Sequence, residues 1–138
     1  MYTEETRGIL AKYLKDLLKK YGIDEKHIGT ASNEQNYINI LRDKKVLLDD
    51  EFFRHLAKDL NLEYIEKEAL RSKSNLAMGL PFNVIKKNLI FILNISAKKV
   101  KIATANPFNF KLFKELGTIF KRDIEICVAT IDAIEEAL

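Results

Sequence analysis

The chain has 138 residues, 47% of them apolar and 31% charged, which is the composition of one globular domain or of two small lobes rather than of a disordered chain. Its net charge is +3, and its single cysteine excludes an intramolecular disulfide and favours a reducing cytoplasm. Its apolar runs are far shorter than the ~20 residues that span a bilayer, and its acidic N-terminus does not resemble a secretory signal.

Residues 1–60 are predicted to form a small helical lobe. From Leu10 to Tyr21 apolar residues recur at three- and four-residue spacing, which predicts a first helix with Gly22 as its C-cap. The polar stretch from Ile23 to Asn33 is predicted to be a connection with a short turn of helix. A second, shorter helix follows, with three apolar residues on one face: Tyr37, Ile40 and Leu41.

A third helix is predicted after Leu48, because Asp49, Asp50 and Glu51 suit the positive N-terminal end of a helix. Its buried side is predicted to consist of Phe52, Leu56 and Leu60. The three consecutive acids also suggest a metal site, but acids at a helix start are more often partners of the helix dipole. No metal ion is therefore predicted here.

Residues 61–138 are predicted to form a mixed α/β lobe with a three- to four-stranded sheet flanked by helices, so the fold class is α+β. Residues 82–85 and 89–95 are rich in Phe, Val, Ile and Leu and favour strands. The last four elements of the chain are expected in the order strand, helix, strand, helix. The four signals for this order are the alternation of Val100, Ile102 and Thr104, the helix start Asn106-Pro107, the alternation of Ile124, Ile126 and Val128, and the N-cap Thr130.

Signatures of catalysis are missing from the sequence. It has no glycine-rich phosphate loop, no Gly-x-Gly-x-x-Gly and no Gly-x-Ser-x-Gly elbow. His27 and His55 are isolated in the sequence, and Cys127 alternates with core residues on a strand, so it is interpreted as a sheet residue rather than a nucleophile. We predict no catalytic residue and no cofactor within the chain.

Basic residues are concentrated in one stretch, since residues 71–122 contain 11 basic side chains and one acidic one. This charge favours acidic partners such as nucleotides, anionic lipids or an acidic protein surface, although the lysines also suit solvated strand ends. Basic and aromatic side chains alternate here, as in some nucleic-acid sites, but the helical spacing of Phe110, Phe113 and Phe120 indicates core residues. No nucleic-acid partner is predicted.

The part of the chain from residue 53 to residue 138 resembles the N-terminal domain of type II secretion and type IV pilus assembly ATPases, the traffic ATPases of the general secretory pathway protein E family. Residues 1–50 match that domain only as helices. The resemblance is carried by five phrases, of which the Ala-Asn-Pro-Phe-Asn turn is the most specific: His55–Ile65, Met78–Phe82, Val100–Asn109, Asp123–Thr130 and Ile134–Ala137.

This resemblance implies a non-catalytic module that docks on the cytoplasmic part of an inner-membrane platform protein and couples a hexameric motor to a secretion or pilus apparatus. It implies a cytoplasmic location, peripheral to the inner membrane through that partner, and ATP and magnesium for the parent protein only. The abrupt end at Leu138 suggests an excised domain. Lys98, Lys99 and Lys101 are the predicted rim of the docking surface.

Two alternatives remain open. The same adaptor is compatible with another output, such as a glycosyltransferase, and some relatives of this domain bind cyclic di-GMP through a pattern of one Arg, two Gly and a terminal Gln. An earlier copy of that pattern keeps Gly22 but has Tyr13 and Lys15 at its Arg and first Gly positions. In the second copy all four positions are changed, in order to Asn36, Ile38, Lys45 and Asp59. These departures disfavour the ligand.

Overall fold

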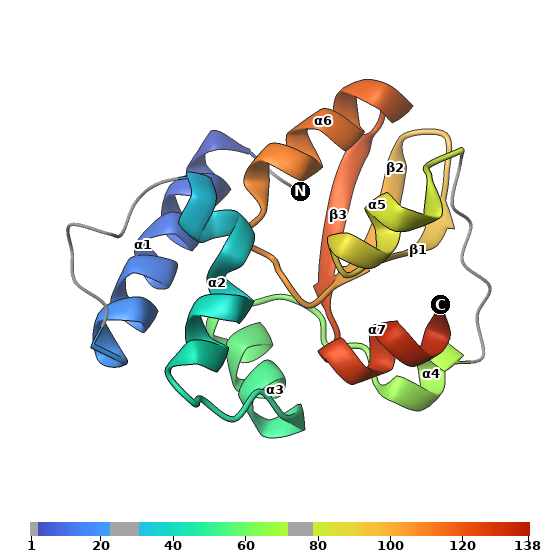
Figure 1. Ribbon diagram of the computed structural model, residues 1–138. Coiled ribbons are helices and arrows are strands. Elements are labelled where there is room, and N and C mark those ends of the chain that lie inside the picture. The colour runs from blue at the N-terminus through green and yellow to red at the C-terminus, as the bar shows by residue number, and fades with distance from the viewer. Residues whose placement is uncertain (1–2, 23–30, 72–78) are drawn as a thin grey trace.

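The computed structural model describes residues 3–22, 31–71 and 79–138. Within these ranges it contains seven helices and one three-stranded sheet (Figure 1), which confirms the predicted α+β class. The elements are α1 (Glu4–Lys20), α2 (Ala31–Asp43), α3 (Asp50–Asp59), α4 (Lys67–Arg71), α5 (Phe82–Lys87), β1 (Ile90–Ile95), β2 (Lys99–Thr104), α6 (Phe110–Phe120), β3 (Asp123–Val128) and α7 (Ile131–Ala137).

The three predicted helices of the first lobe are present as α1, α2 and α3. The Asp49 carboxylate accepts a hydrogen bond from the Phe52 backbone N–H at 3.0 Å, so the predicted acidic helix start is confirmed. Of the predicted buried side of α3, Leu56 is buried, whereas Phe52 and Leu60 are half-buried and Phe53 is in the core instead. Of the predicted connection after the first helix, residues 23–30 lie outside the described residues.

Five helices are followed by a residue with a left-handed backbone. Gly22 was predicted at the end of α1, and its φ is +81°. After α2, the Lys45 N–H donates to the Arg42 carbonyl and the Val46 N–H donates to the Leu41 carbonyl, which is the Schellman pattern. The other four residues in this conformation are not glycine: Lys45, Asn61, Leu89 and Lys121. Their side chains give little sequence signal for such a helix end.

The sheet has the order β1-β2-β3, with β1 antiparallel to β2 and β2 parallel to β3 through α6. Phe91, Ala103 and Cys127 point to one face and pack in the same core as α1, α2, α3 and α7. Ile102 and Ile126 point to the other face, under α5 and α6. Because both faces are covered, the strands are apolar on both sides over much of their length.

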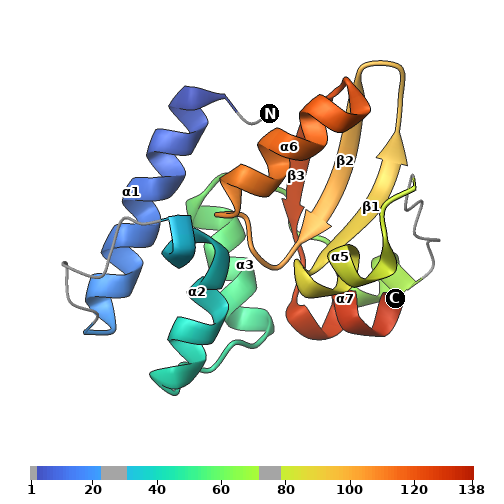
Figure 2. The ribbon, with the colours of Figure 1, turned by 45° about the horizontal axis from the view of Figure 1, so that its top comes forward.

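The helical lobe lies beside β3, and β1 forms the opposite edge (Figure 2). The segment that leaves α3 pairs with the carboxyl end of β3: the Val128 N–H donates to the Glu63 carbonyl and the Ile65 N–H donates to the Val128 carbonyl, both at 2.8 Å. One continuous core therefore crosses the predicted boundary between residues 60 and 61. The division into two subdomains stays a prediction.

The predicted strand at residues 82–85 is wrong, because these residues form the short helix α5. The Pro81 carbonyl accepts hydrogen bonds from the N–H groups of Val84 and Ile85, which closes a helical turn. Only Ile85 is fully buried, and Phe82 is 59% exposed. Composition alone does not separate a short apolar strand from a short helix.

The predicted helix start at Asn106-Pro107 is three residues too early, since the N-cap of α6 is Asn109 and the helix begins at Phe110. The Asn106 side-chain oxygen accepts a hydrogen bond from the Phe108 N–H at 3.0 Å, so this residue closes a separate turn before the helix. Asn109 occupies the N-cap without a side-chain hydrogen bond to the helix. The extra turn places two buried amide side chains, Asn106 and Asn109, between β2 and α6.

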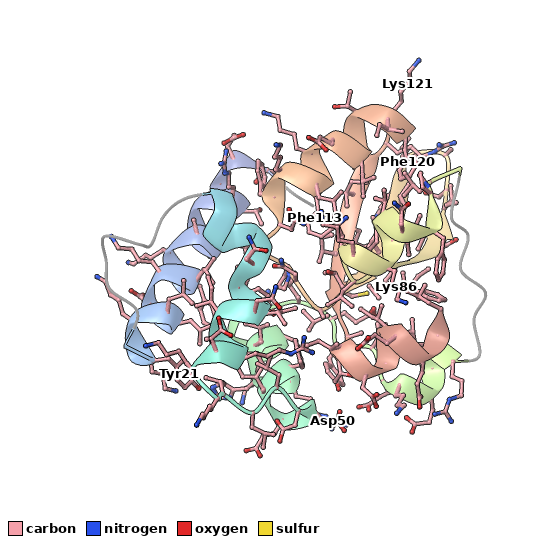
Figure 3. The ribbon with its side chains drawn as sticks, in the orientation of Figure 1. Tyr21, Asp50, Lys86, Phe113, Phe120 and Lys121 are labelled. Carbon is pink, nitrogen blue, oxygen red and sulfur yellow. The ribbon has the colours of Figure 1, made fainter. Side chains whose placement is uncertain are left out.

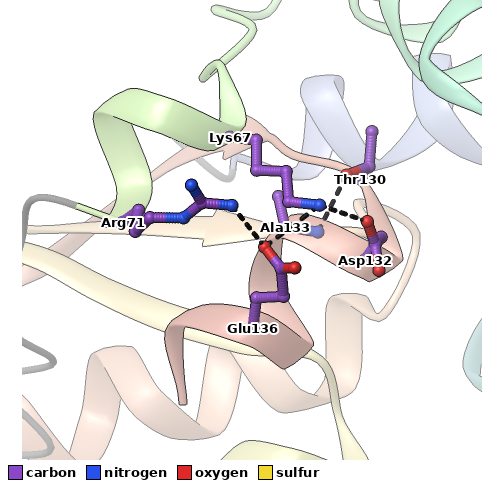
Figure 4. Close-up of polar contacts among 6 residues, drawn as sticks. All are labelled: Lys67, Arg71, Thr130, Asp132, Ala133 and Glu136. Atoms are coloured by element: carbon purple, nitrogen blue, oxygen red, sulfur yellow. Dashed lines mark hydrogen bonds and ion pairs between the residues drawn. The ribbon is translucent and has the colours of Figure 1, made fainter.

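The last helix is held against α4 by an ion-pair network (Figure 4). Lys67 contacts Asp132 and Glu136, and Arg71 contacts Glu136 at 2.8 Å. The two cations lower the pKa of the Glu136 carboxyl. The Thr130 hydroxyl caps α7 by accepting from the Ala133 N–H, as predicted. Because these ions are exposed, the apolar packing of the helices contributes more than the pairs do.

The two lobes meet at Tyr37, which is fully buried. Its hydroxyl donates a hydrogen bond to the Ala105 carbonyl, and its ring packs edge-on against Phe108 with centroids 4.9 Å apart. Phe108 in turn stacks with Tyr13 of α1. The loop between β2 and α6 is therefore enclosed by side chains of the helical lobe.

We predict that Tyr37→Phe lowers the free energy of unfolding by about 1–2 kcal/mol, because the buried Ala105 carbonyl loses this donor. Urea unfolding followed by circular dichroism measures the change, and a single transition is expected because the lobes share a core. Tyr21→Phe, at a half-buried position, is the control and is expected to change stability by less than about 0.5 kcal/mol. An unchanged stability for Tyr37→Phe would contradict this role.

Candidate functional site

The lysines predicted to form the docking rim lie at the end of the sheet where β1 turns into β2. Lys98 and Lys99 are exposed. Lys101 lies further along β2, where its ammonium contacts Glu63 at 2.8 Å, and this contact raises the pKa of Lys101. The Lys99 ammonium is 3.9 Å from Glu125. Two of the three lysines therefore have carboxylate neighbours within the chain.

A second basic turn lies beside this one. The Arg122 side chain donates to the Ser96 carbonyl at 2.8 Å, and the Asp123 N–H donates to the Lys98 carbonyl at 2.9 Å. These hydrogen bonds join the turn after α6 to the β1–β2 turn, and Lys121 extends from the outer end of α6 (Figure 3). We call the four cations that these turns bring together the basic end: Lys98, Lys99, Lys121 and Arg122.

Lys121 and Arg122 are not predicted from the sequence as part of this surface. More than twenty residues separate them from Lys98, and only the parallel register of β2 and β3, which pairs Lys99 with Asp123, brings the turns together. Ile119 lies in the last turn of α6, two residues before Lys121, and its apolar side chain is 61% exposed.

A cavity of about 630 Å³ lies between the lobes, lined by α2, α5, α6, α7 and the loop after β2. Its lining is dominated by amide and basic side chains, with four cations and two carboxylates. The polar lining residues are Asn36, Asn39, Arg42, Lys86, Lys87, Asn88, Asn106, Asn109, Lys111, Glu115 and Glu135.

The turn before α6 supplies the two most buried of these amides, Asn106 and Asn109, each 4% exposed. The Asn109 amide donates to the Asn88 side-chain oxygen at 3.3 Å, which ties the loop to the end of α5. The cavity lies where β2 ends and α6 begins, the position at which α/β sheets bind ligands. Its excess of cations and its many amides suit an anionic ligand with several hydrogen-bonding groups.

Residues 60–138, more than half of the chain, match the model of the MshEN domain. The chain belongs to the MshEN domain family. This membership and the likeness of the fold confirm the predicted resemblance to the N-terminal domain of type II secretion and type IV pilus assembly ATPases.

Two solved structures share the fold of this MshEN domain. One is the structure of MshE with cdg (cyclic di-GMP), whose sequence is 20% identical to this chain. The match covers 89% of this chain and 94% of the MshE chain and has a TM-score of 0.56. The other is the N-terminal domain of XpsE, whose sequence is 12% identical to this chain. The match covers 99% of this chain and 95% of the XpsE chain and has a TM-score of 0.65. At such identities the likeness shows the fold alone. No curated protein matches the sequence of this chain.

The other candidate reactive side chains of the MshEN domain make contacts within the fold. Asp49 caps α3, and the exposed His55 lies 3.4 Å from Asp59. His27 lies outside the described residues. Among the residues that the structure describes, no group of three His, Cys, Asp or Glu side chains could hold a metal ion, and no helix is long and apolar enough to span a membrane.

The three phenylalanines with helical spacing, Phe110, Phe113 and Phe120, are buried as predicted, and so is Phe108. Phe113 and Phe120 pack under α6 against the sheet, and Phe108 contacts the helical lobe. Phe110 is 6% exposed, and the Arg7 guanidinium lies 4.5 Å from the centre of its ring. None of these four phenylalanines is therefore exposed for stacking on a base.

Cys127 is fully buried, and burial raises the pKa of its thiol to about 12. In the unfolded chain a thiol ionises near pH 8.5, so the folded state disfavours the thiolate. The protonated Cys127 thiol therefore makes its full contribution to the stability of the folded state below about pH 8.5, and this contribution is lost as the pH rises towards 12. Cys127 is therefore a core thiol, as predicted.

We predict that a thiol reagent labels the native protein at pH 8 only as fast as the chain unfolds, because the protonated Cys127 thiol is enclosed. The rate measured in increasing urea should rise with the unfolded fraction. The difference in stability between wild type and Cys127→Ala should shrink above about pH 8.5, since only the wild type loses the thiol contribution. Rapid labelling of the native protein would contradict this assignment.

Proposed function

We propose that this MshEN domain is a non-catalytic docking and regulatory module of a type II secretion or type IV pilus assembly ATPase, and that it binds the cytoplasmic part of an inner-membrane platform protein. The basic end is the observation that carries the proposal. Two turns that are distant in sequence place four cations at one end of the sheet, and the exposed Ile119 lies in the last turn of α6, which leads to Lys121. An acidic protein surface with an apolar contact fits this arrangement.

The rest of the assignment follows from this docking. Lys98, Lys99 and Lys101 remain the predicted rim, with Lys121 and Arg122 added, and Glu63 fixes the position of Lys101. The domain would then be cytoplasmic and reach the inner membrane only through its partner. ATP, magnesium and hexamer formation would belong to the motor part of the parent protein. The same adaptor joined to another output, such as a glycosyltransferase, would use the same surface.

We predict that the double variant Lys98→Glu/Lys121→Glu binds the cytoplasmic domain of the cognate platform protein about tenfold more weakly than wild type, because two favourable charge pairs become repulsive. Biolayer interferometry at low and moderate salt measures the affinity, and salt should weaken the wild-type complex. The matched control is Lys12→Glu/Lys44→Glu on the helical lobe, which should bind like wild type. No wild-type binding at tens of micromolar, or equal affinity for both variants, would refute docking at the basic end.

A second candidate function, a cyclic di-GMP sensor, is favoured by the cavity between the lobes and by the likeness to the structure of MshE with cdg. Lys45, at the second glycine position of the known pattern, keeps the left-handed backbone with φ +60°. Asp59, at the glutamine position, instead accepts a hydrogen bond from Tyr13. Arg42, Lys86 and Lys87 are the cations available to phosphate groups in the cavity.

We predict for this candidate that calorimetry detects cyclic di-GMP binding and that Arg42→Ala/Lys86→Ala weakens it at least fivefold, because charge-assisted hydrogen bonds to phosphate are lost. Lys12→Ala, outside the cavity, is the control. Absence of heat at high micromolar ligand would remove this candidate and leave the docking proposal unaffected.

A further inference from the structure

A groove of about 510 Å³ lies on the helical lobe, away from the cavity between the lobes. It is formed by the second half of α1, the loop before α3, and α3 itself, and Tyr21 marks its end on α1 (Figure 3). We call it the acidic groove. Its apolar lining consists of Tyr13, Leu17, Tyr21, Leu47, Phe52 and Leu56, and its acidic lining of Asp16, Asp49, Glu51 and Asp59.

The apolar lining is open to water on one side. Leu56 is 2% exposed and belongs to the core, whereas Phe52 is half-buried and Leu47 is 75% exposed. An exposed leucine beside half-buried aromatic rings leaves apolar surface in contact with water. Exposed apolar surface on a soluble protein marks sites that a partner covers on binding. The groove therefore has the apolar contact surface that a docking partner needs.

The rim is acidic although the chain has a net charge of +3. Four carboxylates line the groove together with two basic side chains, Lys20 and the exposed His55. Asp49 caps α3 and Asp59 accepts from Tyr13, whereas Asp16 and Glu51 are exposed on opposite sides, one on α1 and one on α3. A partner with basic side chains on both flanks would complement this rim.

A hydrogen bond joins the two walls of the groove in the absence of a partner. The Tyr13 hydroxyl on α1 donates to the Asp59 carboxylate on α3 at 2.8 Å, and burial together with this carboxylate raises the pKa of Tyr13. A groove that is already formed loses little conformational entropy on binding.

We propose that the acidic groove binds a basic amphipathic helix of a partner protein, with apolar side chains of the helix packed on Phe52 and Leu47 and its lysines or arginines paired with Asp16 and Glu51. Helices bind to grooves in this way through apolar residues repeated at three- and four-residue spacing. This surface is opposite in charge to the basic end, so it serves a different partner, and the inference does not depend on platform docking or on ligand binding.

The test uses the full chain and a fluorescent peptide of about 15 residues with a leucine stripe flanked by lysines and arginines, which is long enough to form a helix on binding. A matched peptide carries glutamate at every basic position. Fluorescence anisotropy should show binding of the basic peptide that weakens as salt rises, and no binding of the acidic peptide. Equal binding of both peptides, or of neither, would overturn the proposal.

Two pairs of variants locate the site. Glu51→Lys should weaken binding of the basic peptide about fivefold, whereas Glu5→Lys, also in the first turn of a helix, should bind like wild type. Leu47→Ser should weaken it about tenfold, whereas Phe82→Ser, which removes an exposed apolar residue outside the groove, should not. Thermal unfolding checks that each variant is folded, and unchanged binding by folded Glu51→Lys and Leu47→Ser would overturn the site.

A second copy of this chain is the other occupant to examine, because its basic end also complements the acidic groove. Sedimentation velocity over a range of concentrations measures self-association. A dimer that both Glu51→Lys and Lys121→Glu dissociate would assign the groove to a second copy and overturn the partner-helix proposal. A monomer that binds the basic peptide would support it.

Discussion

The hydrogen bond from the Tyr37 hydroxyl to the Ala105 carbonyl joins the two lobes at one buried point. Tyr37 lies on α2 between Asn36 and Asn39, and Ala105 is followed by Asn106, so the same contact positions both walls of the cavity. Phe108 packs on Tyr37 and Tyr13 and extends the contact to α1. The cavity therefore exists because an aromatic residue of the helical lobe encloses the loop between β2 and α6.

Charge divides the molecule into surfaces of opposite sign. Residues 1–70 contain 12 basic and 14 acidic side chains, whereas residues 71–138 contain 11 and 6. The acidic groove lies in the first part, the basic end lies in the second, and the mixed cavity lies between them. Surfaces of opposite charge would favour different partners, because each one repels proteins of its own sign.

The amphipathic helices and the two parallel strands were predictable because their periodicity is local. Other features depend on contacts between distant residues. The basic end needs the register that pairs Lys99 with Asp123, and the acidic groove needs α1 beside α3. Left-handed helix ends at Lys45 and Lys121 use residues that do not favour this backbone, and α5 is too short for its periodicity to separate it from a strand. The sequence therefore predicts the elements better than the surfaces.

One helix contributes to both surfaces of the second lobe. The first half of α6 lines the cavity with Lys111 and Glu115, and its last turn leads through Ile119 to Lys121 at the basic end. Its apolar side is packed on the sheet through Phe113, Leu116 and Phe120, so the helix can move only as a unit. For a ligand in the cavity to regulate docking, it would have to bind differently to two positions of this helix. Without such a difference, occupancy of the cavity would leave the affinity of the basic end unchanged.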